Sequence, residues 1–330
     1  MDDTVLSRVN EHRADEEGRG RAAAQPHHIP WLGWRDILLR LRDGIARDRI
    51  GTIAAGTTFF LLLSLVPSLA ALVSLYGLVA DPATIGDHLA LLRGYVPPGL
   101  LELVEGELHR LTANRSSTLG LGFAVGILVA LWSANSGMKA LLDSLNVAYG
   151  EAEERGFLKL LGVSISFTLG AIMFFVVALN LMIGVPLVIR FLPLGPVGDL
   201  LLAILPALVM FAAAVLGLAM LYRFGPSRAK AKWRWITPGS LAAAVLWLIG
   251  SILFSWYVST WSNYSATYGS LGTLIGVMMW IYLSMWVVLI GAELNAQIEH
   301  QTAQDTTLGP DRPLGERGAF MADHVGQAQG

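Results

Sequence analysis

Four polar residues recur at helical spacing within an otherwise apolar part of the chain: Asn135, Lys139, Asp143 and Asn146. Separations of four, four and three residues place them in one stripe along a helix, next to an apolar face of methionine and leucine. Amide, ammonium and carboxylate groups in one row can bind a polar or charged group, and Lys139 can pair with Asp143 one turn away. We therefore expect this row to line a polar cavity.

The surroundings of this row follow from the composition of the chain. Of its 330 residues, 54% are hydrophobic and 15% are charged, and the mean hydropathy is +0.55. Soluble chains average about 25% charged residues. Residues 51–79 contain no charged side chain, whereas about 20 apolar residues are enough for a helix to cross the hydrocarbon core. The composition therefore predicts a polytopic membrane protein.

The apolar runs predict an all-α membrane bundle of six transmembrane helices, within a membrane domain of residues 34–299. The expected spans are residues 51–79, 118–138, 157–190, 198–222, 236–260 and 270–296. Residues 80–117 place apolar side chains at helical spacing beside charged ones, which predicts amphipathic helices on the outer surface, either as a packed lid or as a substrate gate. Residues 1–33 and 300–330 are polar and of mixed charge, which predicts disordered cytoplasmic tails.

Basic residues set the expected orientation. Five arginines lie within residues 35–49, directly before the first span, and five lysines and arginines lie in RFGPSRAKAKWRW, between the fourth and fifth spans. The connection between the fifth and sixth spans has no charge. The positive-inside rule then places both termini on the cytoplasmic side.

Several classes of partner and chemistry are not expected. The net charge of −2 gives no reason to expect nucleic acid as a partner. The absence of cysteine excludes disulfides, thiolate metal sites and thiol catalysis. The seven histidines lie in the tails or in the outer connection, so no catalytic metal site is expected, and without a GxxxxGK[ST] phosphate loop no ATP site or other cofactor is expected either.

Three further polar residues lie near the same membrane depth as the row. Arg155, at the start of the third span, either solvates a turn or, like Lys139, holds a lipid phosphate. Glu293, near the end of the sixth span, either forms a structural ion pair or is a coupling site for a proton or ion. We expect Arg155, Glu293 and Asn295 to line one polar cavity with the row, built from the second, third and sixth spans.

We expect the segment WSNYSATYGSLGTLIG, residues 261–276, to lie at the opposite membrane surface. Its aromatic residues predict an interfacial anchor, and its glycines leave open a re-entrant turn that borders a substrate path. The candidates for such an outer gate are Asn263, Tyr264, Tyr268 and Gly269. The Gly272 and Gly276 pair predicts a close helix approach, within one molecule or between two, so no oligomeric state follows.

Four stretches in fixed order carry a resemblance to a known family. They are TTFFLLLSLVPSL, LWSANSGMKALLDSLNVAYGEAEERGFLK, PGSLAAAVLWLIGSILFSWYV and NYSATYGSLGTLIGVMMWIYLSMWVVLIGAELN. From about Trp34 to His300 the chain resembles the YihY/BrkB family of bacterial inner-membrane proteins. The resemblance implies a six-span inner-membrane protein with both ends inside. Members have carried the label ribonuclease BN, and others have been linked to serum resistance, to the envelope or to lipid movement.

Together these features predict a transporter-like protein that moves or handles a lipid or another amphipathic envelope component. Membrane lipids are then its partners, and an envelope protein is a further candidate partner. One alternative is an envelope scaffold that transports nothing, in which the polar row only fixes helix register. A less favoured alternative is the transfer-RNA-processing ribonuclease of the old family label, because the sequence has no cluster of histidines and carboxylates for metal-dependent cleavage.

Overall fold

The computed structural model describes residues 3–76, 105–106, 121–191, 196–261 and 271–329. Its long helices are α3 (Ile50–Tyr76), α6 (Leu121–Tyr149), α7 (Phe157–Phe191), α8 (Pro196–Phe224), α9 (Trp233–Trp261) and α11 (Leu271–Glu299). Each corresponds to one expected span. Over their described residues, α7, α8, α9 and α11 are long and apolar enough to cross a membrane, and α2 (Trp31–Arg47) with α3 adds a fifth span if the pair, bent by 58°, is counted as one. The all-α membrane bundle is thus confirmed, whereas the number of six spans stays a prediction.

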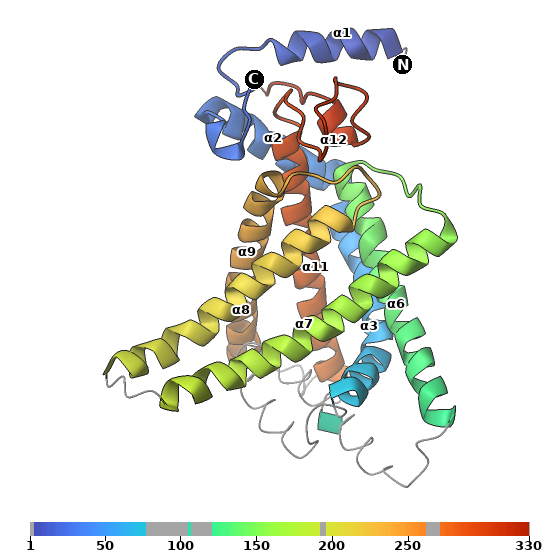
Figure 1. The fold of residues 1–330 in the computed structure, drawn as a ribbon, viewed down its shortest axis with the longest axis vertical. Coiled ribbons are helices and arrows are strands. Elements are labelled where there is room, and N and C mark those ends of the chain that lie inside the picture. The colour runs from blue at the N-terminus through green and yellow to red at the C-terminus, as the bar shows by residue number, and fades with distance from the viewer. Residues whose placement is uncertain (1–2, 77–104, 107–120, 192–195, 262–270, 330) are drawn as a thin grey trace.

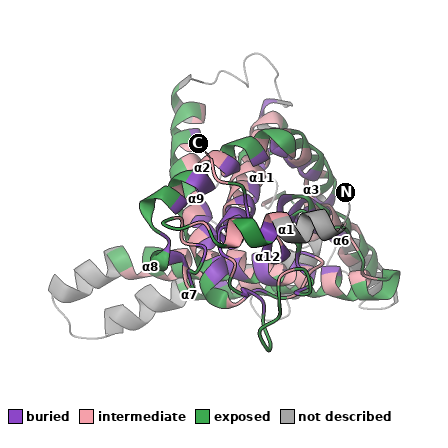
Figure 2. Ribbon diagram, turned by 90° about the horizontal axis from the view of Figure 1, so that it is seen from above, coloured by how far each residue is buried: buried purple, intermediate pink, exposed green. Residues whose placement is uncertain are grey.

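Helix α11 is the central helix of the bundle (Figure 1). It packs against α9, α3, α2 and α6, and α3 packs along α6. Buried residues make up 33% of the apolar stretch of α11, against 17–18% in α7, α8 and α9. Seen from above, α8 lies at one side of the bundle, where it packs against α7 (Figure 2). The outer helices therefore present most of their apolar side chains to the surroundings.

The core lies where five helices converge at one end of the bundle. Its buried side chains come from α3, α6, α8, α9 and α11 and include Ile50, Leu145, Tyr149, Tyr222 and Leu289. Small residues of α11 and α9 fill the spaces between them and let the helices approach closely. This end is also where both described ends of the chain lie (Figure 1).

Helix α6 continues past residue 138, where the expected span ended, to Tyr149. It ends at Gly150, whose φ of +67° is a conformation that glycine adopts without strain. The Gly150 N–H donates to the carbonyl of Val147 at 3.0 Å, and the Glu151 N–H donates to that of Asn146 at 2.8 Å. These two bonds form a Schellman motif. The polar row therefore lies on continuous helix.

Both tails, which the sequence predicts to be disordered, have ordered structure in their described residues. They contain α1 (Asp3–Ala14), η1 (Pro26–His28) and α12 (Phe320–Asp323), and residues 9–30 and 300–329 together cover one end of the bundle, here called the cap. Arg21 donates to the carbonyls of Gln301 at 3.1 Å and Gly326 at 2.7 Å. Arg317 donates to four carbonyls between residues 303 and 322. The polar composition predicts disorder, but the tails are ordered because these arginines donate hydrogen bonds to backbone carbonyls within the tails.

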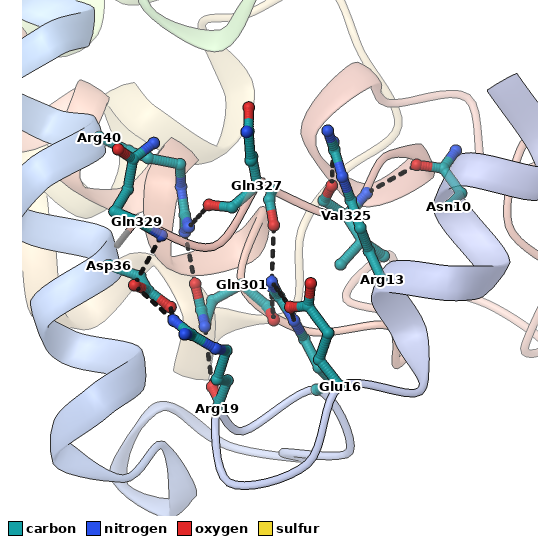
Figure 3. A network of polar contacts seen from close by, with 12 residues as sticks. Asn10, Arg13, Glu16, Arg19, Asp36, Arg40, Gln301, Val325, Gln327 and Gln329 are labelled. Carbon is teal, nitrogen blue, oxygen red and sulfur yellow. Dashed lines mark hydrogen bonds and ion pairs between the residues drawn. The ribbon is translucent and has the colours of Figure 1, made fainter.

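The cap is joined to the bundle through α2 and α11 (Figure 3). Arg40 of α2 donates to the side chain of Gln297 on α11 at 3.0 Å and to the carbonyl of Gln327 at 3.0 Å. Asp36 of α2 pairs with Arg19 at 2.6 Å and accepts the N–H of Gln329 at 3.0 Å. Both tails thus contact the same face of α2, which holds α2 beside α11.

Acidification is expected to open the cap through His300. Burial, and then the positive groups around the ring, lower the pKa of His300 to about 3; these groups are Arg40, His324, Arg13 and Arg21. In an open cap the pKa of His300 returns to about 6.5. The closed cap therefore has its full stability above pH 6.5 and loses stability as the pH falls from 6.5 toward 3. At pH 5 the loss amounts to at most about 2 kcal/mol, or about 30-fold more frequent opening than at pH 7.

Hydrogen exchange of the backbone amides in residues 300–329, corrected for the intrinsic rate at each pH, measures this opening. The His300→Gln variant, which has no titrating ring, is the control for the other groups that change charge in this range. We expect a shallower pH dependence in the variant. Equal pH dependence in both proteins would show that His300 is not the group responsible.

Candidate functional site

The first two residues of the polar row have separate neighbours on α6 and α7. Asn135 is 2% exposed, and its side-chain oxygen accepts a long hydrogen bond, 3.4 Å, from the hydroxyl of Thr168 on α7. The Lys139 ammonium lies 5.7 Å from the ring centroid of Trp132 on α6 and 5.7 Å from that of Phe157 at the start of α7. Asn135 is therefore part of the α6–α7 contact, and Lys139 lies at its edge.

Lys139 does not form an ion pair with Asp143. Among the described residues, no carboxylate lies within ion-pair distance of the Lys139 ammonium, and Asp143 is exposed. Trp132 and Phe157 are 63% and 66% exposed. The exposed surface of the α6–α7 junction thus carries a cation next to two exposed aromatic residues.

Asn146 and Arg155 connect the end of α6 to neighbouring segments. Asn146 donates to Glu153 at 3.1 Å and accepts the backbone N–H of Ser227 at 2.7 Å. Arg155 forms two hydrogen bonds to the Glu153 carboxylate, at 2.7 and 2.6 Å. These bonds from Arg155 are the main reason that the pKa of Glu153 falls to about 2. Arg155 is therefore bound to Glu153 within the α6–α7 connection. The hydrogen bonds of Asn146 hold this connection next to Ser227.

Glu293 is fully buried on α11, facing α2. One carboxylate oxygen accepts the side-chain N–H of Gln297 at 2.9 Å, and the other has no hydrogen-bond partner. A Cβ added to Gly44 of α2 would collide with this carboxylate, so the two helices touch here. The expected ion pair is not found, because no cation of the described residues lies within ion-pair distance of Glu293. A buried carboxylate without a cation is unfavourable when charged.

Asn295 lies where α9 and α11 cross. Its side-chain oxygen accepts the backbone N–H of Gly239 at 2.8 Å. A Cβ added to Gly239 would collide with the carbonyl oxygen of Gly291, so the two backbones are in contact. By contrast, a Cβ added to Gly276, where we expected close approach, meets nothing within 4 Å. Asn295 therefore stabilises a helix crossing.

The structure also contains a buried ion pair that the sequence did not indicate. Arg228, in the basic connection between α8 and α9, lies 2.7 Å from Glu299 at the end of α11, and the two side chains are 2% and 0% exposed. The Arg228 guanidinium also lies 5.0 Å from the ring centroid of Tyr149. A basic connection is ordinarily solvated, so only the tertiary contact identifies this arginine as part of the core.

The expected cavity residues thus divide into distinct groups. No hydrogen bond or ion pair of the described residues joins the row on α6 to Glu293 or Asn295. The outer-gate candidates Asn263, Tyr264, Tyr268 and Gly269 lie outside the described residues, as does the connection 80–117 apart from residues 105–106. Of the expected site residues, Lys139, Asp143 and Glu293 are the charged groups without an ion-pair partner among the described residues.

Comparisons with known proteins identify the family. The chain matches the family model described as virulence factor BrkB over residues 41–314. It is 37% identical over 248 residues to YfkH of Bacillus subtilis (strain 168), which is named as ribonuclease-like, covering 74% of this chain and 88% of the relative. It is 27% identical over 282 residues to a UPF0761 membrane protein of Pseudoalteromonas translucida, covering 83% of this chain and 88% of the relative.

No solved structure matches the chain. The family model nevertheless spans most of the membrane bundle and part of the cap, from α2 to residue 314. The similarity to the UPF0761 membrane protein extends over a comparable share of the chain. The chain therefore belongs to the YihY/BrkB family of integral membrane proteins.

Proposed function

We propose that this protein moves or handles a lipid or another amphipathic envelope component in the bacterial inner membrane, and that Lys139 binds the anionic headgroup of that substrate. The observation that carries the proposal is the Lys139 ammonium, which lies between the exposed rings of Trp132 and Phe157 without a carboxylate of the described residues beside it. One helical turn before Lys139, Asn135 accepts a hydrogen bond from Thr168 within the α6–α7 contact.

The chemistry of this position favours a phosphate ligand. Aromatic rings attract a cation by about 0.5–2 kcal/mol, but they do not neutralise its charge. A phosphate oxygen would supply both the opposite charge and a charge-assisted hydrogen bond. Tryptophan rings prefer the headgroup depth of a membrane. We therefore expect Lys139 to lie at the membrane depth of the lipid phosphates.

The apolar surface of α7 supports a lipid rather than a small anion. Exposed apolar side chains follow one another at four-residue spacing along α7, starting two turns after Phe157: Ile165, Leu169, Met173 and Val177. This spacing keeps them on neighbouring positions of one helix face. Such a stripe suits the acyl chains of a lipid whose headgroup is at Lys139.

Orientation is part of the proposal. The cap, the arginine-rich helix α2 and the basic connection between α8 and α9 lie at the same end of the bundle (Figure 1). The positive-inside rule then favours the cytoplasm as the location of this end and of both termini. We therefore expect the headgroup at Lys139 to come from the cytoplasmic leaflet. Besides lipids, an envelope protein is a further candidate partner.

Purified protein in liposomes that contain a fluorescent phospholipid tests this proposal. Lys139→Gln is expected to slow lipid redistribution by about tenfold, because a hydrogen bond to a charged group contributes about 1.5–3 kcal/mol. Lys159→Gln is the matched control, since it removes the same charge from an exposed position at the start of α7. If both variants fold and redistribute lipid equally fast, Lys139 is not the headgroup site. If the wild type redistributes no lipid, the scaffold function is favoured.

A nuclease is the second candidate, favoured by the ribonuclease-like name of the Bacillus relative. Incubation of the purified protein with transfer RNA separates it from the first. Cleavage that persists through stringent purification and disappears on substitution of a residue in this chain would support the nuclease. Cleavage that is unaffected by every such substitution would point to a contaminant.

A further inference from the structure

A second cation with aromatic neighbours lies at the junction of α8 and α9, on a different helix pair from Lys139. Arg223, in the last turn of α8, is 8% exposed. Its guanidinium carbon lies 4.2 Å from the ring centroid of Trp233 and 5.3 Å from that of Phe224. These two rings pack edge to face, 6.2 Å apart. The guanidinium is thus held in place by rings from both helices.

The positive charge at this junction is not balanced by the protein. The Nε and Nη1 atoms of Arg223 are buried and have no hydrogen-bond partner. The Lys230 ammonium lies 5.1 Å from the centroid of the same Phe224 ring. Among the described residues, no carboxylate lies within ion-pair distance of either cation. Both cations thus lie near the Phe224 ring without a carboxylate partner, and a bound anion would supply the missing opposite charge.

We propose that Arg223 and Lys230 bind the phosphate group of an anionic membrane lipid. A phosphate accepts hydrogen bonds from a guanidinium and an ammonium and neutralises both. The junction is at the end of a membrane helix, and the Trp233 ring is partly exposed, as is usual at headgroup depth. The site therefore combines charge, hydrogen-bond donors and the depth at which lipid phosphates lie.

The surfaces next to Arg223 favour a lipid over free phosphate. On α8, exposed Met220 and Leu216 precede Arg223 by three and seven residues, which places them on the same helix face. On α9, Leu241 lies eight residues after Trp233, Val245 lies four residues after Leu241, and both are exposed. Acyl chains can lie along these side chains while the phosphate contacts the cations. Free phosphate would gain nothing from them.

This site does not depend on the proposed lipid movement, because it concerns binding at α8 and α9 alone. The test uses the full chain in detergent, titrated with phosphatidylglycerol and observed by native mass spectrometry. Lys139→Gln serves as the background so that adducts at the α6–α7 junction do not contribute. We expect Arg223→Gln in this background to weaken phosphatidylglycerol binding by about tenfold or more, and Lys230→Gln by a smaller factor.

Controls separate the outcomes. Arg42→Gln removes an equal charge from an exposed position on α2 and is expected to leave binding unchanged. Equal losses in Arg42→Gln and Arg223→Gln would overturn the proposal, because general surface charge would then explain binding. Inorganic phosphate that binds as tightly as the lipid, with the same dependence on Arg223, would overturn the assignment to a lipid. If Arg223→Gln does not fold, exposed Lys230 carries the test, and unchanged binding in Lys230→Gln would overturn the proposal.

Discussion

Replacing Gly239 with alanine is expected to destabilise the protein by about 3 kcal/mol or more. The added methyl group would collide with the carbonyl oxygen of Gly291 and come within 2.5 Å of the Asn295 side chain. Overpacking usually costs about 1–3 kcal/mol, and the upper end applies here because the obstacle is backbone. The methyl group would also displace Asn295, which accepts the Gly239 N–H. We therefore expect α9 and α11 to separate at the crossing.

Thermal unfolding in detergent, followed by size-exclusion chromatography, measures this effect. Gly276→Ala is the matched control on α11, because a Cβ at Gly276 meets nothing within 4 Å. Alanine is about 1 kcal/mol better than glycine in a helix, so this variant is expected to melt at or slightly above the wild-type temperature. If the two alanine variants melt together, the crossing of α9 and α11 is looser than the structure indicates.

Replacing Arg228 with methionine is expected to cost about 3–5 kcal/mol, because Glu299 would be left as a buried charge without a partner. Both side chains are almost completely buried, and the guanidinium also contacts the Tyr149 ring. The matched control is Asp311→Asn, in which the Asp311 side chain is 84% exposed and pairs with Lys232 at 3.3 Å. An exposed pair contributes at most about 1 kcal/mol, so the control is expected to unfold like the wild type.

The double variant Arg228→Met with Glu299→Leu distinguishes the loss of a pair from the presence of a single unpaired charge. Replacing both partners of a buried pair with apolar residues is often neutral, so most of the lost stability should return. Unfolding temperature measured by intrinsic fluorescence in detergent provides the comparison. A double variant no more stable than Arg228→Met would mean that the carboxylate of Glu299 is not the source of the loss.

Helix positions could be predicted from the length of the apolar runs, because a membrane helix must cover the hydrocarbon core. The expected span 157–190 nearly coincides with α7, Phe157–Phe191. The second span was predicted to end at residue 138, before Lys139, although α6 continues to Tyr149. Gly150 was the available signal, since a glycine directly after an apolar helix is the usual helix end.

Partners of the polar groups could not be predicted, because they come from distant parts of the chain. Spacing pointed to Asp143 as the partner of Lys139, whereas the ring of Phe157 lies beside it. Arg228 belonged to a connection that looked solvated, yet it pairs with Glu299, 71 residues away. Local spacing describes one helix face and contains no information about what packs on it.

Close helix contacts and ordered tails were missed for a related reason. Gly276 belongs to a GxxxG pair but has open space around it, while Gly239 and Gly291, which belong to no GxxxG pair, form the contact. In the tails, Arg21 donates hydrogen bonds to carbonyls of residues 280 and 305 positions later in the chain. Composition records how polar a segment is, and it does not record whether those polar groups bind one another.

The most direct test of the central claim is an experimental structure of the protein in nanodiscs that contain phosphatidylglycerol. The claim is that the Lys139 ammonium binds a lipid headgroup on the exposed surface of the α6–α7 junction. We predict density for a phosphate within hydrogen-bond distance of Lys139, between Trp132 and Phe157, with acyl chains along α7. A structure in which Lys139 pairs with Asp143 instead, with no headgroup beside it, would contradict the claim.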